Sequence, residues 1–203
     1  MFRLFSYCLP FKKKSDPTIV NLSSKKVLKE IEKELDVIVV SYGGSCSNTL
    51  TRMLENNKIR CRSKLWHKIL CHSPFIPDVS VPIIYIFDNP VKAFRSMKTR
   101  GIGFWDVNQR KLSNNKYSEL SDLNLMKLMM TQFDRFVENP EKKKILMFPT
   151  YLLFKEEGKK KLEEFFGKEL NNFPAIFVSP KTSSSDVDFF LNFSDQIKKI
   201  KSY

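Results

Sequence analysis

A loop of small residues is the first feature of this sequence that could do chemistry. Residues 43–49 read Gly-Gly-Ser-Cys-Ser-Asn-Thr and follow the apolar run Val37–Val40 and the pair Ser41-Tyr42. Glycines let the backbone turn tightly, so that several N–H groups and the start of a following helix can point at one anion. Further donors are the side chains of Ser45, Ser47, Asn48 and Thr49. The loop predicts a phosphate or sulfate cradle, and a plain strand–turn–helix connection is the alternative.

His72 is the second candidate, because it stands between an apolar stretch and the turn residues Ser73-Pro74. An imidazole with an ordinary pKa near ~6.5 is a suitable general base at neutral pH. A surface or core histidine in front of a turn proline is the alternative. His67 precedes the apolar stretch and is expected to be structural.

Two cations and a hydroxyl share one side of the segment after Pro90. Lys92, Ser96 and Arg100 are spaced four residues apart, which places them on one face of a helix. This face predicts an anion contact next to Asp88. The alternatives are a solvated basic stripe, or pairing of one cation with the Asp88 carboxylate.

Alternating apolar strands and helical segments are expected to position these residues. The expected strands are Val37–Val40, 68–71, Ile83–Phe87 and 145–148. The expected helices cover about 23–35, 48–56, 90–100, 120–137, 155–166 and 187–200. This order predicts a single three-layer α/β domain, with a mainly parallel sheet flanked by helices and Val37–Val40 as a central strand. Ligands of such sheets bind at the carboxyl ends of the strands, here residues 41–49, 71–75 and 88–100.

The three strand exits, taken in order, resemble the sulfotransferase family. Its loop Tyr-Pro-Lys-Ser-Gly-Thr-Thr corresponds to residues 42–48, its Lys-Thr-His to 70–72, and its Tyr-x-x-Arg-Asn-Pro to 85–90. Ser96 follows Asp88 by eight residues, as the family's phosphate-binding Ser follows its Arg. Residues 145–167 are similar to the family's later strand and its helix ending in Phe-Leu-Gly, so the resemblance covers about residues 36–168.

The resemblance implies a P-loop-like fold and sulfuryl transfer from 3′-phosphoadenosine 5′-phosphosulfate to a hydroxyl or amine acceptor, without a metal ion. His72 would be the base, and Ser96 and Arg100 would bind the 3′-phosphate. The phosphosulfate would be bound by Tyr42, Gly43, Gly44, Ser45, Cys46, Ser47, Asn48 and Thr49.

The sequence departs from the family at two charged positions. Gly44 stands where the family has the loop Lys, and Asp88 stands where it has the Arg that binds the 3′-phosphate. A Gly44→Lys substitution is expected to restore the missing cation. The departures favour, as an alternative, a non-catalytic module that binds nucleotides or polyanions. A P-loop small-molecule kinase is a further alternative, although no Walker A Lys is present.

Composition bounds the partners. The 203 residues carry a net charge of +13 and are 42% hydrophobic, which fits one globular domain with anionic partners, nucleic acid among them. Four Cys without a C-x-x-C pair indicate free thiols in a reducing cytoplasm. Residues 1–20 are expected to be a tail able to contact an anionic membrane surface, and 21–203 the domain. The wealth of Lys, Asn and Phe fits an AT-rich genome, such as that of a large virus or a protist.

Overall fold

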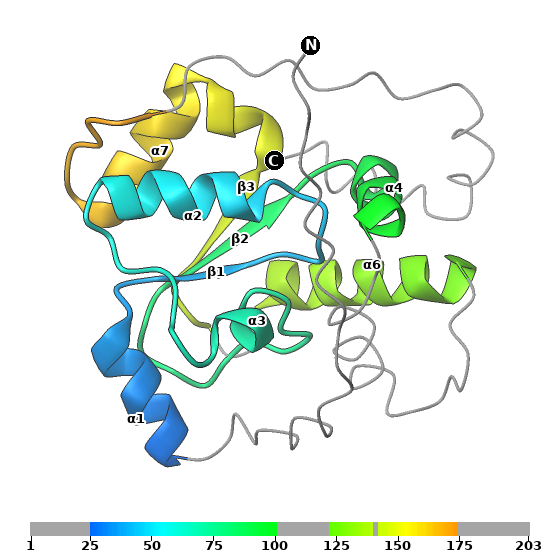
Figure 1. The fold of residues 1–203 in the computed structure, drawn as a ribbon, viewed down its shortest axis with the longest axis horizontal. Coiled ribbons are helices and arrows are strands. Elements are labelled where there is room, and N and C mark those ends of the chain that lie inside the picture. Colours follow the sequence, from blue (N-terminus) through cyan, green and yellow to red (C-terminus); the bar gives the residue numbers. More distant parts are fainter. Residues whose placement is uncertain (1–24, 101–121, 140–141, 174–203) are drawn as a thin grey trace, which may run out of the picture.

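Three parallel strands form the sheet in the part of the chain that the computed structural model describes, residues 25–100, 122–139 and 142–173. They are β1 (Ile38–Val40), β2 (Ile83–Phe87) and β3 (Ile145–Pro149), in the order β1-β2-β3 (Figure 1). Ile38 pairs with Ile83 in one ladder, and Ile84 pairs with Leu146 in the other. All residues of β1 and β2 are buried, as expected for strands covered on both faces.

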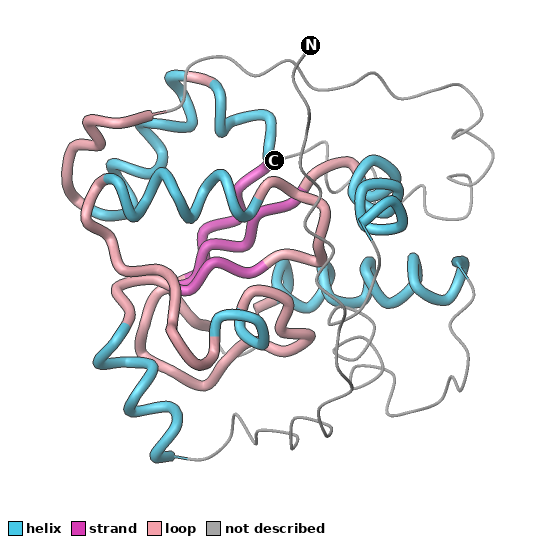
Figure 2. Tube along the Cα trace, in the orientation of Figure 1, coloured by secondary structure: helices cyan, strands magenta, loops and turns pink. Residues whose placement is uncertain are grey.

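Helices cover both faces of this sheet (Figures 1 and 2). On one face, α2 and α7 pack with the 3₁₀ helix η1 against the odd-numbered side chains of β1 and the even-numbered ones of β2. The opposite face packs against side chains of α1, α4 and α6. The bounds are α1 Lys25–Glu34, α2 Ser47–Asn56, α3 His67–Leu70, α4 Pro90–Arg100, α6 Asp122–Glu138, η1 Thr150–Phe154 and α7 Glu156–Phe166.

Aromatic side chains fix α6 to the central strand. The ring centroids of Tyr85 and Phe136 lie 4.4 Å apart, and those of Phe87 and Phe133 lie 5.1 Å apart. All four side chains are fully or almost fully buried. Such pairs add to the free energy of burial, so α6 has a firmly defined position under β2.

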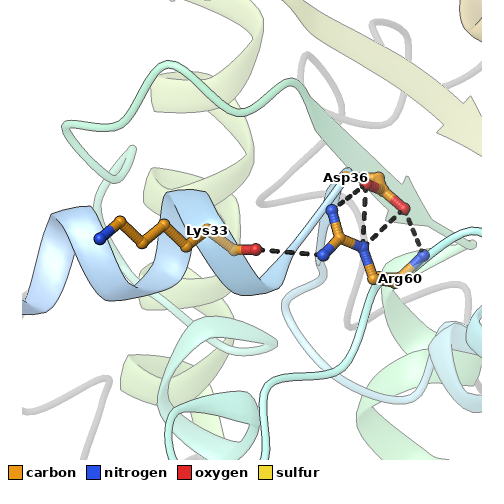
Figure 3. Close-up of polar contacts among 3 residues, drawn as sticks. All are labelled: Lys33, Asp36 and Arg60. Atoms are coloured by element: carbon orange, nitrogen blue, oxygen red, sulfur yellow. Dashed lines mark hydrogen bonds and ion pairs between the residues drawn. The ribbon is translucent and has the colours of Figure 1, made fainter.

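The chain just before β1 is bonded to the segment that follows α2. The N–H groups of Asp36 and Val37 donate to the Arg60 carbonyl at 2.8 and 3.3 Å. The Arg60 guanidinium in turn contacts the Asp36 carboxylate, at 2.6 Å from Nη2 to Oδ1, and donates to the Lys33 carbonyl (Figure 3). These bonds join the last turn of α1 to the start of β1.

The α/β class, the parallel sheet and its covering helices confirm the sequence-based prediction of the fold. The strand expected at 68–71 is wrong, because residues 67–70 form the single helical turn α3, in which the Cys71 N–H donates to the His67 carbonyl. In the described sheet the central position expected for Val37–Val40 is also wrong. With no strand at 68–71, β1 lies at the edge and β2 in the centre.

Other expectations fall on residues outside the described ranges. They are the tail at 1–20 and the last helix at 187–200. No helix within the described ranges has the length and apolar character needed to cross a membrane.

Candidate functional site

The glycine loop connects β1 to α2 through left-handed backbone conformations. The φ angles of Gly43 and Gly44 are 97° and 68°, and that of Cys46, which caps α2, is 54°. Glycine adopts such angles without steric cost, which explains the two glycines here. Tyr42, Gly43 and Ser45 are buried, Asn48 is exposed, and Gly44, Cys46, Ser47 and Thr49 are half-buried. The predicted turn and helix start are therefore both present.

Side-chain hydroxyls hold this loop from inside. The Gly43 N–H donates to Ser41 Oγ at 3.2 Å, and Ser45 Oγ donates to the Gly43 carbonyl at 3.0 Å. Thr150, at the exit of β3, lies with its Oγ1 3.2 Å from the Ser45 carbonyl and 2.8 Å from the Phe87 carbonyl. The Ser45 hydroxyl thus helps to shape the loop.

Four backbone N–H groups of the loop are left as donors. Within the described residues, no hydrogen bond uses the N–H groups of Gly44, Ser45, Ser47 and Asn48. The next two, from Thr49 and Leu50, donate to the Cys46 carbonyl. Orphan N–H groups at the start of a helix, together with the positive end of the helix dipole, favour an anion.

Tyr42 ties the exits of the first two strands together. Its hydroxyl donates to the Asp88 carbonyl and accepts from the Asp88 N–H at 3.0 Å. The ring is completely buried, and burial raises the pKa of Tyr42 far above its ordinary value, so the phenol is neutral. Tyr42, which the sequence assigned to ligand binding, is thereby used to hold β1 and β2 in place.

Gly44 lies directly against the backbone of α4. A Cβ atom at this position would be 2.6 Å from Ala93 Cα and closer still to the Ala93 carbonyl oxygen. Because non-bonded atoms never approach so closely, only glycine fits between the loop and α4. This contact corrects the expectation for Gly44→Lys: a lysine side chain has no room at this position.

The start of α4 is built from Asp88, Asn89 and Pro90. Asn89 Oδ1 accepts from the Val91 N–H at 3.0 Å, and Asp88 Oδ1 accepts from the Asn89 N–H at 2.7 Å. Asparagine before proline at the first helical position is a strong helix start. Burial raises the pKa of the Asp88 carboxyl, an effect that the Asn89 N–H and the Lys92 charge oppose.

The two residues expected at a 3′-phosphate lie in the later turns of α4. Ser96 is half-buried and stands one helical turn beyond Ala93, the contact of Gly44. Arg100 is the last residue of the helix, and its side chain lies outside what the structure describes. The structure therefore brings the helix of Ser96 to the loop, while the place of the Arg100 guanidinium stays a prediction.

His72 lies beside the root of the loop. Its Nδ1 is 3.2 Å from the Ser41 carbonyl oxygen, and the Ser41 N–H donates to the Cys71 carbonyl at 2.9 Å. The side chain is half-buried. His72 follows α3 instead of a strand, yet it still reaches the carboxyl end of β1, as the proposed role of a base requires.

The Arg62 side chain, a cation that no sequence motif indicates, lies on the first turns of α2. Arg62 Nη2 donates to Thr51 Oγ1 at 2.6 Å and lies 3.4 Å from the Asn48 carbonyl oxygen. Its Nη1 is 3.5 Å from a carboxylate oxygen of Glu55. Neither Arg62 nor Thr150 stands in a motif, so only the tertiary arrangement reveals them.

Comparison with known proteins adds no relative. No family model, curated protein or solved structure matches this chain. The resemblance to sulfotransferases thus depends on the residues alone. Within the described ranges, no three His, Cys, Asp or Glu side chains are grouped as a metal site would require.

Proposed function

We propose that this chain is a sulfotransferase-like enzyme with a P-loop-like fold, which transfers a sulfuryl group from 3′-phosphoadenosine 5′-phosphosulfate to a hydroxyl or amine. One observation supports it above all. The glycine loop, α4 and His72 come from separate parts of the sequence and meet at the carboxyl ends of β1 and β2. They are joined by contacts between Gly44 and Ala93, Tyr42 and Asp88, and His72 and Ser41. Donor, base and acceptor need this proximity.

The roles follow from the chemistry of each group. The N–H groups of Gly44, Ser45, Ser47 and Asn48 would bind the phosphosulfate. Ser96 with Arg100 would contact the 3′-phosphate. The acceptor oxygen or nitrogen attacks sulfur, the bond from sulfur to the bridging oxygen breaks, and adenosine 3′,5′-bisphosphate leaves with that electron pair. The acceptor proton passes to His72. The N–H groups favour the negative charge that spreads over the transferred group.

Asp88 favours a second candidate, a non-catalytic module that binds nucleotides or polyanions. Its partly buried carboxylate stands at the end of β2 where an enzyme of this kind needs a cation. A negative charge there opposes binding of a 3′-phosphate. Such a module would use its net charge of +13 on nucleic acid or sulfated glycan, and that binding would weaken steeply with salt.

The membrane contact of the N-terminal tail and the cytoplasmic location stay predictions as well. The free thiols of Cys46, Cys61 and Cys71 support a reducing compartment.

Thermal unfolding with adenosine 3′,5′-bisphosphate tests the enzyme first. A ligand at 100 times its Kd stabilises the folded state by about 2.7 kcal/mol, which raises the melting temperature measurably. His72→Ala should keep this stabilisation and lose turnover of radiolabelled donor, because the base acts on the acceptor. His67→Ala is the matched control, which should keep both.

The outcomes separate the candidates. Stabilisation by ATP–Mg²⁺ but not by the bisphosphate would indicate the kinase. Stabilisation by neither ligand, with salt-dependent binding to heparin or single-stranded DNA, would indicate the binding module. Full turnover in His72→Ala would reject His72 as the base.

A further inference from the structure

We propose that Gln132 and Arg135 of α6 are positioning residues that set the orientation and tautomer of His72. The inference deepens the proposed function and rests on it for the role of His72 as a base. Neither residue stands in a motif of the sequence. They are three residues apart, so they project from one face of α6 toward the loop that follows His72.

Two side chains of α6 hold two successive carbonyls of this loop. Gln132 is completely buried, and its Nε2 donates to the Ser73 carbonyl at 2.6 Å. Arg135 Nη1 donates to the Pro74 carbonyl at 2.9 Å, and its guanidinium carbon lies 4.6 Å from the centroid of the Phe75 ring. Hydrogen bonds from a charged guanidinium are stronger than those from neutral donors. The chain just after His72 is thus fixed by a helix that is itself fixed under β2.

The chain just before His72 is fixed by β1. The Cys71 carbonyl accepts from the Ser41 N–H at 2.9 Å, and Cys71 is almost fully buried. His72 therefore spans two anchored points, β1 on one side and α6 on the other. If residues 73 and 74 were released from α6, the His72 ring would move relative to the Ser41 carbonyl.

The contact with this carbonyl favours one tautomer of His72. A carbonyl oxygen only accepts, so His72 Nδ1, at 3.2 Å from the Ser41 oxygen, must carry the proton to form the bond. The lone pair of the neutral ring then lies on Nε2, the nitrogen that would take the proton of an acceptor. By holding residues 73 and 74, α6 keeps this bond in place.

Nitrogen–proton correlation spectra of the imidazole rings in the full-length chain test the inference. The chain has two histidines, so His67 serves as an internal reference. The wild-type His72 should be protonated at Nδ1. In Gln132→Leu and in Arg135→Met the ratio of the Nδ1–H to the Nε2–H form of His72 should fall about fivefold. This is the effect of losing one hydrogen bond, here the bond from His72 Nδ1 to the Ser41 carbonyl. Arg135→Lys, which keeps a cationic donor, should restore much of the wild-type ratio.

Thr131→Ala is the matched control on α6, because the exposed Thr131 hydroxyl bonds within the helix, to the Lys127 carbonyl at 2.9 Å. It should leave the tautomer unchanged. If Gln132→Leu does not fold, Arg135→Met and Arg135→Lys decide, since Arg135 is only half-buried. An unchanged tautomer in folded Arg135→Met, or a wild-type His72 protonated at Nε2, overturns the inference.

Binding of adenosine 3′,5′-bisphosphate is measured on the same samples. We expect the same Kd in the wild type and in the Arg135 variants, because α6 acts on His72 and not on the glycine loop at residues 43–49. A wild type that does not bind the bisphosphate rejects the proposed function, whereas an altered tautomer ratio would still show that α6 positions His72. An unchanged ratio rejects this inference alone.

Discussion

Asp88 is the residue whose charge conflicts most with an anion site. Burial raises the pKa of its carboxyl, which means that ionisation of Asp88 costs more free energy in the folded than in the unfolded chain. The protonated form contributes stability below the ordinary pKa, and this contribution is lost as the pH rises through the folded value. Asp88→Asn keeps an oxygen for the Asn89 N–H and removes the charge. At pH 7 it should raise the free energy of unfolding by on the order of 1 kcal/mol.

The same substitution should strengthen binding of adenosine 3′,5′-bisphosphate about fivefold, because one repulsive charge near the site disappears. Denaturant unfolding at pH 7 and pH 3.5 and a titration with the ligand measure both effects. Asp78→Asn is the control of opposite sign, since the Lys143 ammonium lowers the pKa of Asp78 and the substitution should destabilise at pH 7. If Asp88→Asn lowers the free energy of unfolding at pH 7, the ionised Asp88 carboxylate does not destabilise the fold, and the prediction is wrong.

Gly44 combines two requirements, a left-handed φ and contact with α4. Gly44→Ala should therefore lower the free energy of unfolding by about 2–4 kcal/mol, the sum of the backbone and overpacking costs. It should also abolish ligand binding, because the loop must move away from Ala93. Gly44→Lys should behave alike and gain no activity.

Gly167→Ala separates the two costs for Gly44. Gly167 has a φ of 66°, close to that of Gly44, but a Cβ atom there would meet no atom within 4 Å. Its substitution should cost only about 1–2 kcal/mol in denaturant unfolding. Equal losses for Gly44→Ala and Gly167→Ala would show that the contact with α4 is dispensable.

At the scale of elements, Gly158 fixes α7 on η1. A Cβ atom at Gly158 would lie 2.6 Å from the Leu152 carbonyl carbon and closer to its oxygen, although the backbone of Gly158 is helical. Gly158→Ala should lose about 1–3 kcal/mol in spite of the better helix propensity of alanine. Thermal and denaturant unfolding measure this loss, and Glu157→Ala, at an exposed position of the same helix, is the control. A stabilised Gly158→Ala would show that α7 can shift on η1.

The elements that the sequence predicted correctly are those with a clear length and pattern. Ile83–Phe87 is a five-residue β-branched and aromatic run, and the helix after Asn89-Pro90 has its cap in the sequence. The run at 68–71 is too short for its pattern to separate a strand from one turn of helix. The edge position of β1 and the contacts of Gly44 with Ala93 and of Thr150 with Ser45 depend on how distant elements pack, which no local pattern encodes.

At the scale of the whole molecule, carboxylates tie the chain together near the starts of all three strands, opposite the proposed site. Asp36 binds Arg60 before β1 (Figure 3). Glu32 accepts from Ser80 before β2, and Asp78 pairs with Lys143 before β3. Each of these bonds lowers the pKa of its carboxyl. Glu34 belongs to the same set, since it accepts from the Ser63 hydroxyl at 2.6 Å and the Lys64 N–H at 2.7 Å.

Because these pKa values are lowered by folding, the stability that the carboxylates contribute is present above their ordinary values and is lost as the pH falls through the folded ones. We therefore expect the free energy of unfolding to fall steadily below about pH 4.5, the ordinary value for Glu34. Glu34→Gln should cost about 0.5–1 kcal/mol at pH 7, because one of two bonds to a largely solvated carboxylate is lost. The difference from the wild type should shrink as the pH falls below 4.5 and through the lowered pKa of folded Glu34. Glu30→Gln, at an exposed position of α1, should match the wild type over the same pH range in urea unfolding. A Glu34→Gln cost that does not shrink as the pH falls would mean that packing, and not charge, holds α1 to the loop at Ser63.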